Sequence, residues 1–541
     1  MQYVVPSWYR QDGWSENERL WYRSKDVTEF DDTVKQVQLF FRRHVAPFRI
    51  VLLGYAPNFR HFLHRQGVYH TPWWSCFDAI QAVRSRAMRP FSFRDLAWPK
   101  GVEFLYTPFA VVAMLAGEKY AQVEFAEDGN MFRVDLFRDD ALVARNLYDD
   151  RGFVSCQVDY QDGVPVRRRL FDEDGTWRLA ESLSDGHVVV NPKVAWYLHD
   201  GVEGTRRVPY RRERYESVDD VIEEVLEDYL ADAAPDDVFT VAMHPRHSAV
   251  LSRALRGRTT VLSFFDRRMG DGLTEAGRAL LASCSCVVAD KEATASRVRA
   301  QAGTIAAPIR VISPYETRVE VGDSLHLRVQ NVLVAVDALD DVLFDAVAVC
   351  LAEYVAEKNG LARVCLFTRS SRYDVAADLL SRVRAALGRA GLDPAMAEPR
   401  EGRSENELPE GEDGTHPPCV FSVRQCVDEL HVSRTMREQR VVVDLSPRPD
   451  QFLQISAMSM GVPQVTAHST EYVVDGRNGR VLHDVRELAD AVDFYLGSME
   501  HFNEAQIASY EIGGKFSAQE LVRAWKEVIG IGGHQGAPAR D

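Results

Sequence analysis

Two histidines beside one predicted strand end are the clearest candidates for acid–base chemistry in this sequence. The run His244-Pro245-Arg246-His247 directly follows residues 238–242, an apolar stretch typical of a buried strand. A histidine in such a place can act as a base or contact a sugar hydroxyl. A polar loop that simply follows a strand has the same pattern, so both interpretations stay open. A metal site is disfavoured, because no third ligand is spaced to complete it.

Tryptophan is concentrated near the start of the chain, where it offers a second kind of chemistry. An indole ring can stack on the apolar face of a sugar, and it can equally fill a core. Trp8 and Trp14 are the best sugar candidates, because they follow the first predicted strand, where the chain leaves the sheet. Core packing is the alternative for each of the six early tryptophans, which are Trp8, Trp14, Trp21, Trp73, Trp74 and Trp98.

Composition and missing motifs exclude several classes of protein. The 541 residues include 64 Lys and Arg against 80 Asp and Glu, and a net charge of −16 argues against nucleic acid as a partner. We expect a cytoplasmic protein, because the start lacks the regions of a signal peptide and the longest apolar run is too short to span a bilayer. The eight cysteines form no CxxC pair and are predicted to be reduced. No GxSxG, P-loop or HExxH motif occurs, and neither a cofactor nor a metal is predicted.

The most informative stretch is residues 441–482, which has the form strand, loop, short helix, strand and turn. It contains Ala457-Met458, Gly461-Val-Pro463 and Asp475-Gly-Arg-Asn-Gly479. In these motifs it resembles the nucleotide-sugar half of GT-B glycosyltransferases of the retaining family-four type. That resemblance implies a ligand cleft between two halves, at the carboxyl ends of their strands. The candidate carbohydrate or cleft contacts are Trp8, Trp14, His244, His247, Gly461 and Glu471.

The positions that would perform transfer do not match that family. Its two glutamates, which lie beside the transferred sugar and the donor ribose, would fall on Arg448 and Ser456. Arginine has only hydrogen-bond donors and serine is short and neutral, so neither replaces a carboxylate. Where the family places cations for the diphosphate, this chain has Asp337 and Asp341. A like charge at ~4 Å costs roughly 4 kcal/mol in a medium of dielectric constant about 20. The donor site is therefore predicted to be vacated.

A second set of motifs extends over nearly the whole chain, from Met1 to about Lys526. On these motifs the sequence resembles the family of accessory secretory protein one of the bacterial accessory Sec system, which is far more specific than a fold-level likeness. The motifs are Pro6-Ser7-Trp8-Tyr9, Phe30-Asp-Asp-Thr33, Phe93-Arg-Asp-Leu-Ala-Trp-Pro99, Pro108-Phe-Ala-Val-Val112, Tyr148-Asp-Asp-Arg-Gly-Phe153, Val443-Asp-Leu445, Gly461-Val-Pro-Gln464, Phe494-Tyr495-Leu496 and Trp525-Lys526.

This resemblance implies a non-catalytic, GT-B-shaped component of an export machinery. Members of the family work with accessory secretory proteins two and three and with the accessory Sec ATPase. Together they export serine-rich repeat glycoprotein adhesins, whose glycans the members are expected to bind. The resemblance also implies a cytoplasmic protein that associates peripherally with the membrane export complex. An active family-four-like glycosyltransferase with an unusual donor site is the alternative.

The elements that must position these residues are of two kinds. Around residues 120–190, Gly129, Gly152 and Gly175 lie 23 residues apart, each after acidic residues, with alternating apolar and polar residues between them. This repeat predicts an antiparallel meander of hairpins. Elsewhere, short apolar runs alternate with helical segments, and residues 102–106 are interpreted as one more strand of this parallel kind. Such alternation predicts parallel sheets covered on both faces.

The predicted fold is α/β, a GT-B-like pair of Rossmann-type halves with an inserted antiparallel β-meander domain. The first half comprises residues 1–115 and 206–315, and the inserted sheet comprises residues 116–205. The second half comprises residues 316–500. Residues 501–530 are predicted to form helices that return to the first half, and residues 531–541 to form a disordered tail.

Overall fold

A computed structural model describes residues 1–9, 13–15, 30–126, 128–194, 210–270, 272–303, 305–398 and 419–530. The chain divides into two compact units. The first unit comprises Met1–Asp26, Gln36–Ile312 and Trp525–Asp541, and the second comprises Val27–Lys35 and Ser313–Ala524. Three sheets are found in the described residues, two of them in the first unit. Each unit is described by itself below.

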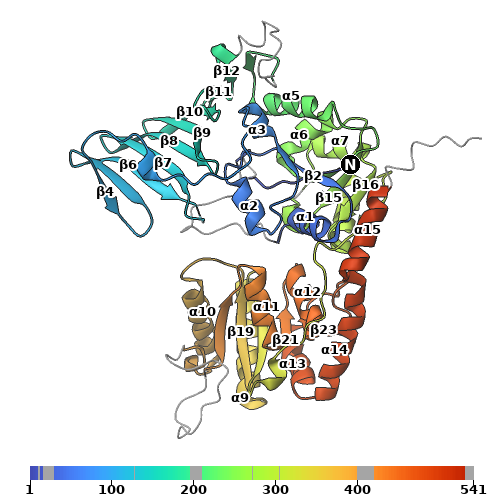
Figure 1. Ribbon diagram of the computed structural model, residues 1–541. Helices are drawn as coiled ribbons and strands as arrows, with labels where there is room; N and C mark the ends of the chain where they lie inside the picture. The colour runs from blue at the N-terminus through green and yellow to red at the C-terminus, as the bar shows by residue number, and fades with distance from the viewer. Residues whose placement is uncertain are drawn as a thin grey trace, which may run out of the picture. The chain divides into compact units, whose positions relative to one another are not determined.

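The first unit contains a seven-stranded parallel sheet with the order β17-β16-β15-β14-β1-β2-β3. Its inner strands are mostly apolar and buried, as expected of strands covered on both faces; β14 is buried at all five positions. Helices lie on both faces of this sheet (Figure 1). The strands are β1 (Gln2–Val5), β2 (Phe48–Leu52), β3 (Trp73–Ser75), β14 (Val238–Ala242), β15 (Thr259–Phe264), β16 (Cys286–Ala289) and β17 (Ile309–Val311); the helices are α1 (Asp32–Arg43), α2 (Phe59–Arg65), α3 (Cys76–Ile80), α5 (Val218–Leu230), α6 (Pro245–Ala254), α7 (Glu275–Ser283) and α8 (Glu292–Ala302).

A ten-stranded antiparallel sheet is inserted between β3 and β14, with its strands in chain order from β4 to β13. Gly129, Gly152 and Gly175, the glycines of the sequence repeat, occupy turns at φ of 81°, 85° and 80°, a conformation that glycine adopts without strain. The strands are β4 (Val102–Tyr106), β5 (Val111–Leu115), β6 (Glu118–Phe125), β7 (Met131–Arg138), β8 (Ala141–Asp149), β9 (Phe153–Gln161), β10 (Val164–Phe171), β11 (Trp177–Ser182), β12 (Val188–Val190) and β13 (Arg214–Tyr215).

The interpretation of residues 102–106 as a parallel strand is wrong. These residues form β4, which pairs antiparallel with β5 from Val102 opposite Leu115 to Tyr106 opposite Val111. A short turn closed by a bond from Thr107 N to Ala110 O joins the two strands, so the run forms a hairpin and cannot enter a parallel sheet. The antiparallel sheet therefore extends on both sides of the expected bounds, 116–205.

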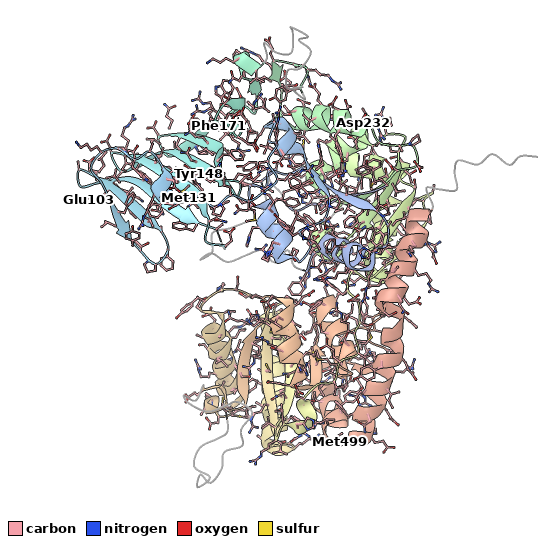
Figure 2. The ribbon with its side chains drawn as sticks, in the orientation of Figure 1. Glu103, Met131, Tyr148, Phe171, Asp232 and Met499 are labelled. Atoms are coloured by element: carbon pink, nitrogen blue, oxygen red, sulfur yellow. The ribbon has the colours of Figure 1, made fainter. Side chains whose placement is uncertain are left out.

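The antiparallel sheet buries opposite faces at its two ends. Val134 is opposite Asn146, and Cys156 is opposite Leu147. Because neighbouring residues of a strand point to opposite faces, Val134 and Cys156 lie on different faces. Val134 packs into a small core with Met131 and Tyr148, which are labelled in Figure 2, whereas Cys156 joins the core of the seven-stranded sheet.

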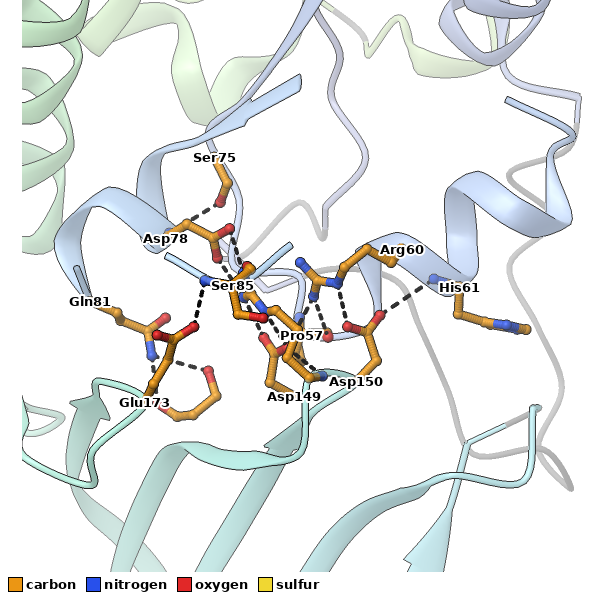
Figure 3. A network of polar contacts seen from close by, with 12 residues as sticks. Pro57, Arg60, His61, Ser75, Asp78, Gln81, Ser85, Asp149, Asp150 and Glu173 are labelled. Carbon is orange, nitrogen blue, oxygen red and sulfur yellow. Dashed lines mark hydrogen bonds and ion pairs between the residues drawn. The ribbon is translucent and has the colours of Figure 1, made fainter. Parts of the chain in front are cut away.

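A buried ionic network holds this sheet to α2 and α3 at the turn between β8 and β9 (Figure 3). Arg60 of α2, 2% exposed, pairs with both Asp149 and Asp150 of that turn. Arg151 binds Asp149 at 2.6 Å and reaches Asp78 of α3 at 2.7 Å. Burial raises the pKa of Asp150 to about 7, although the Arg60 guanidinium opposes this shift. The network fixes the sheet at the place where its buried face changes.

The second unit contains a six-stranded parallel sheet with the order β20-β19-β18-β21-β22-β23. Apolar cores lie on both of its faces, one against α9, α10 and α13 and the other against α11 and α12. The strands are β18 (Gln330–Ala335), β19 (Ala362–Thr368), β20 (Phe421–Gln425), β21 (Gln439–Asp444), β22 (Gln464–Thr466) and β23 (Gly479–Val481); the helices are α9 (Asp341–Glu357), α10 (Val375–Ala390), α11 (Glu429–Arg437), α12 (Gln451–Ser459), α13 (Leu488–Leu496), α14 (Met499–Gly513) and α15 (Ala518–Gly530).

The last two helices differ from the expectation that residues 501–530 return to the first half. Helix α14 packs on α12 and α13 within the second unit. Only the end of α15, from Trp525 onward, belongs to the first unit. There the Trp525 ring meets Phe40 of α1 edge to face, with ring centres 5.5 Å apart. The predicted tail, residues 531–541, lies outside the described residues.

Candidate functional site

In the first unit, the two candidate histidines start α6 beyond the carboxyl end of β14. His244 is the N-cap, and its Nδ1 accepts a hydrogen bond from Arg246 N at 3.1 Å, while Pro245 occupies the first helical position. Both features favour a helix start at this point. His247 lies one turn later, hydrogen-bonded to the Tyr9 hydroxyl from the segment after β1.

Burial keeps these histidines neutral. It lowers the pKa of His244 to about 4 and that of His247 well below its usual value, and the positive charge of Arg268 acts in the same direction. Burial also raises the pKa of Tyr9 well above its usual value. The side chains of His244 and His247 are 5% and 0% exposed. Both side chains thus lie inside the first unit, where His244 caps α6 and His247 bonds to Tyr9 of the segment after β1.

The two candidate tryptophans also prove to be packed inside the first unit. Trp8 is 6% exposed and lies against Phe62, with ring centres 4.9 Å apart. Trp14 is 3% exposed, donates from Nε1 to Asp219 at 2.7 Å and has the Arg246 guanidinium 4.7 Å above its ring. Because no indole face is free, the core-packing alternative describes both residues better than sugar stacking. Trp21 lies outside the described residues.

In the second unit, Asp337, one of the residues expected at a donor site, lies at the carboxyl edge of the parallel sheet. Asp337 follows β18, and its carboxylate accepts hydrogen bonds from Thr368 Oγ1 and, at 2.7 Å, from Arg369 N. Arg369 directly follows β19, and its guanidinium lies 4.0 Å above the Phe30 ring. An acid and a cation therefore lie side by side where two neighbouring strands end.

The cation at this edge is already neutralised. Arg369 donates to Asp450 from Nε at 2.5 Å and from Nη2 at 3.1 Å, a two-pronged pair that is strong for an arginine and a carboxylate. Asp450 is also the N-cap of α12 and accepts from Leu453 N at 3.0 Å. Because Asp450 neutralises the Arg369 guanidinium, Arg369 is not available to bind a diphosphate.

A second carboxylate organises the loop between β21 and α12. Asp444, at the end of β21, accepts hydrogen bonds from Ser446 Oγ at 2.6 Å and from Asp450 N at 2.8 Å. Burial raises the pKa of Asp444 to about 6, and these hydrogen bonds to the ionised form oppose the rise. The loop is thus folded onto its own acids instead of presenting backbone N–H groups to a ligand.

The amino end of α9 also carries acids. A helix start attracts anions through its free N–H groups and its dipole. Here Asp340 caps the helix by accepting from Leu343 N at 2.8 Å. Asp341, in the first turn, is exposed and pairs with Arg382 of α10 at 2.9 Å. The helix start that follows β18 is therefore occupied by carboxylates of the chain itself.

The remaining candidates are dispersed over the second unit. Arg448 is exposed in the loop before α12, and Ser456 lies within α12, where its Oγ donates to Phe452 O at 2.7 Å. Gly461 is at the opposite end of α12, at φ +67°, covered by Gln506 and Tyr510 of α14. Glu471 is half-buried in the loop between β22 and β23. Gly461 therefore serves close packing, while Arg448 and Ser456 adjoin the Arg369–Asp450 pair along the chain.

The pair of Arg369 and Asp450 was not anticipated from the sequence. Arg369 follows an apolar strand, as Asp337 does one strand earlier, and this shared position was the available signal. Among the described residues, no group of three or more His, Cys, Asp or Glu side chains is arranged to hold a metal ion. No helix in the described part of the chain has the length and apolar character needed to cross a membrane.

Two parallel α/β sheets, with an antiparallel sheet inserted into the first unit, are the architecture expected of a glycosyltransferase-like protein of the GT-B fold. The pneumococcal O-GlcNAc transferase GtfA, solved with UDP and GlcNAc, superposes with a TM-score of 0.68 at 10% identity over 98% of this chain and 99% of the transferase chain. At that identity the likeness concerns the fold alone, and it confirms the predicted fold class.

Sequence comparison assigns the chain more narrowly than the fold does. The model for accessory Sec system protein one, Asp-one, matches residues 1–530, and the chain belongs to this family. The Asp-one protein of Streptococcus gordonii is 30% identical over 97% of this chain and 98% of its own length. The Gap123 glycosylation-associated complex of Streptococcus agalactiae contains a chain with a TM-score of 0.76 and 25% identity, covering 97% of this chain and 99% of that one. The predicted family membership is confirmed.

Proposed function

We propose that this accessory Sec component is a non-catalytic, carbohydrate-binding scaffold for the export of serine-rich repeat glycoprotein adhesins. In this role the chain binds glycans of the adhesin and holds partner proteins, without transferring sugar itself. The protein acts in the cytoplasm and associates peripherally with the membrane export complex. No bound cofactor is needed for such a role.

The observation that carries this proposal is the closed ionic pair at the carboxyl edge of the second sheet. A nucleotide-sugar diphosphate needs uncompensated cations or free helix N–H groups. Here Arg369 is bound by Asp450, and Asp337 adds a further negative charge beside it. The start of α9 is capped by Asp340. These contacts favour a scaffold over a transferase at this site.

The proposed partners are accessory secretory proteins two and three, together with the accessory Sec ATPase. Two related chains support the first two partners, because they were solved in assemblies. One is the Gap123 complex mentioned above, and the other is the complex of accessory secretory proteins 1, 2 and 3 of Streptococcus pneumoniae. The ATPase and the glycosylated adhesin are proposed on the ground of membership in the accessory Sec family.

The experiment that tests this proposal compares glycosylated and unglycosylated serine-rich repeat protein. Calorimetry should show that the full chain, alone or with proteins two and three, binds only the glycosylated form. Free N-acetylglucosamine at high concentration should compete. Equal binding to both forms would contradict the carbohydrate part of the proposal. Transfer of sugar to the unglycosylated form would favour the alternative, an active glycosyltransferase.

A further inference from the structure

One outer edge of the ten-stranded antiparallel sheet is formed by β4, which pairs with β5 and with no other strand of the described residues. Figure 1 shows β4 as the last strand of this sheet, and Figure 2 labels its Glu103 at that end. A strand in this position presents a row of unpaired N–H and C=O groups to another chain. With five residues, β4 is longer than the edge strands β3, β17 and β23 of the parallel sheets, which have three each.

The hairpin turn after β4 shows which of its backbone groups face outward. Thr107 N donates to Ala110 O at 3.0 Å, so these two residues form a hydrogen-bonded pair. The ladder continues from there to the start of β4 without a register shift. Hydrogen-bonded and non-bonded pairs alternate along an antiparallel ladder, so every second residue of β4 directs its N–H and C=O groups away from β5. The outward-facing residues are Val102, Phe104 and Tyr106.

Two of these three residues have backbone groups that are unpaired in the described part of the chain. Neither the N–H nor the C=O group of Phe104 and Tyr106 has a hydrogen-bond partner there, whereas Val102 N donates to Pro99 O at 3.3 Å. The strand also lacks the proline, lysine or bulge that commonly protects an edge. Leu105 and Tyr106, which are 54% and 62% exposed, add apolar surface. Such an edge is suited to pairing with another strand.

The side chains of β4 match those of a second β4 that runs in the opposite direction. Phe104 is the middle residue and faces outward, so a two-fold axis at this residue aligns all five residues of both strands. On one face, Phe104 then lies opposite Phe104 of the other copy, and Val102 lies opposite Tyr106. Pairs of aromatic residues with each other or with β-branched residues stabilise a sheet. On the other face, Glu103 lies opposite Leu105, so no like charges are directly opposed.

The same alignment gives partners to the outward-facing backbone groups. Phe104 N of each copy donates to Phe104 O of the other, and Tyr106 N of each copy donates to Val102 O of the other. These hydrogen bonds leave the bond from Val102 N to Pro99 O intact. The antiparallel sheets of the two copies thereby become one continuous sheet.

We infer that a second copy of this chain pairs with β4, so that the protein forms a two-fold symmetric dimer through the edge of its antiparallel sheet. The contact is small, because a standard interface has about 20–30 residues on each side and β4 supplies five. The dimer is therefore weak, with a dissociation constant on the order of 10 µM. It holds two glycan-binding chains together and so raises the avidity for a repetitive glycoprotein; this consequence alone rests on the proposed function.

Sedimentation equilibrium of the full chain, without glycan or partner proteins, tests for the dimer. A monomer–dimer equilibrium should appear between about 1 and 100 µM protein. Tyr106→Pro removes an N–H group that points away from β5, and it should weaken the dimer at least tenfold relative to the matched variant Tyr106→Ser, which keeps that group. Both variants lose the same exposed ring. A chain that stays monomeric, or equal dimerisation of the two variants, would overturn the inference.

A second pair of variants tests the register and gives an answer even if the proline variant does not fold. Leu105→Lys places a cation opposite Glu103 of the other copy and should strengthen the dimer several-fold, whereas Leu105→Glu opposes like charges and should weaken it by a similar factor. Sodium chloride at about 0.5 M should reduce both effects, because it screens exposed charges. Changes of the same sign in the two variants would contradict the register.

Co-purification separates a second copy from another protein at this edge. Accessory secretory proteins two and three should co-purify with Tyr106→Pro as fully as with Tyr106→Ser, because their binding does not need the outer edge of β4. Their loss from the proline variant alone would show that one of them pairs with β4, and it would overturn the assignment to a second copy.

Discussion

At the scale of single residues, the proposed loss of nucleotide-sugar binding rests on the partner that Arg369 has within the chain. Arg369 keeps a guanidinium at the carboxyl edge of the second sheet, but Asp450 of the same chain binds it with two hydrogen bonds. Asp337 accepts from the backbone of Arg369 and so places a second carboxylate nearby. Glutamates introduced at Arg448 and Ser456 would leave the pair of Arg369 and Asp450 unchanged.

The double variant Arg448→Glu with Ser456→Glu should therefore gain no transferase activity. It supplies the two carboxylates that the sequence comparison finds missing, but the diphosphate still meets Asp337 and a neutralised Arg369. UDP release from UDP-GlcNAc, measured by a coupled assay, should stay at the level of the unaltered chain. Turnover clearly above that level would show that the site is closer to active than its ion pairs indicate.

The buried histidines make the stability of the first unit depend on pH. The unfolded chain binds a proton at His244 with a pKa near 6.5, whereas the folded protein does so near 4. Between these values the unfolded state holds more protons, so the free energy of unfolding falls as the pH falls from about 6.5 to 4.

His244→Asn should make this dependence shallower, by at most roughly 1 kcal/mol per pH unit. Asparagine retains an acceptor for the N-cap of α6 but has no titrating group in this range. The measurement is chemical denaturation at several pH values between 4 and 7. An identical slope in the variant and the unaltered protein would contradict the neutral, buried state of His244.

At the scale of elements, two glycines with nearly the same φ separate the cost of a close contact from the cost of a left-handed backbone. Gly461 and Gly476 have φ of 67° and 69°. A Cβ on Gly461 would overlap Gln506 and lie 3.1 Å from Tyr510 of α14, whereas a Cβ on Gly476 would meet nothing within 4 Å.

Gly476→Ala should cost about 1 kcal/mol, the price of a left-handed conformation for alanine. Gly461→Ala should cost roughly 1–3 kcal/mol more, because it also forces α12 and α14 apart. Urea unfolding of both variants provides the comparison. Equal losses would show that Gly461 does not serve close packing of these helices.

A similar pair of variants tests the ionic network that holds the antiparallel sheet to α2 and α3. Arg60→Gln leaves buried Asp150 without its arginine partner, whereas Asp149 keeps Arg151, and the change should destabilise the first unit by about 3 kcal/mol or more. Arg167→Gln removes an exposed pair with Asp159 on the same sheet and should cost less than about 1 kcal/mol. Thermal unfolding should rank them in this order, and the reverse order would refute the anchoring role of the network.

Local sequence patterns predicted most of the elements but fewer of the contacts. The continuous apolar runs identified the parallel strands, and the 23-residue repeat identified the hairpins, because both patterns follow from which faces are buried. Residues 102–106 were misassigned, since a short apolar run looks alike in parallel and edge strands. The sequence could not show that the Trp14 ring is covered, because Arg246, whose guanidinium lies over that ring, is distant in sequence. The Arg369–Asp450 pair escaped prediction for the same reason.

At the scale of the whole molecule, the chain combines a glycosyltransferase fold with membership of an export family. The fold is shared with a transferase that was solved with UDP and GlcNAc, and the family with accessory Sec proteins. A chain that keeps the fold but no longer binds a nucleotide-sugar would still have other surfaces with which to bind glycans and partner proteins. The central claim is therefore that this chain does not use a nucleotide-sugar.

Titration calorimetry of the full chain with UDP and with UDP-GlcNAc tests that claim most directly. A GT-B transferase of the GtfA type, measured in the same buffer with Mg²⁺ and without it, is the positive control. The closed pair of Arg369 and Asp450 predicts no binding heat for either nucleotide with this chain, and no UDP release on prolonged incubation. Binding in the millimolar range or tighter, accompanied by UDP release, would contradict the account and identify the protein as a glycosyltransferase.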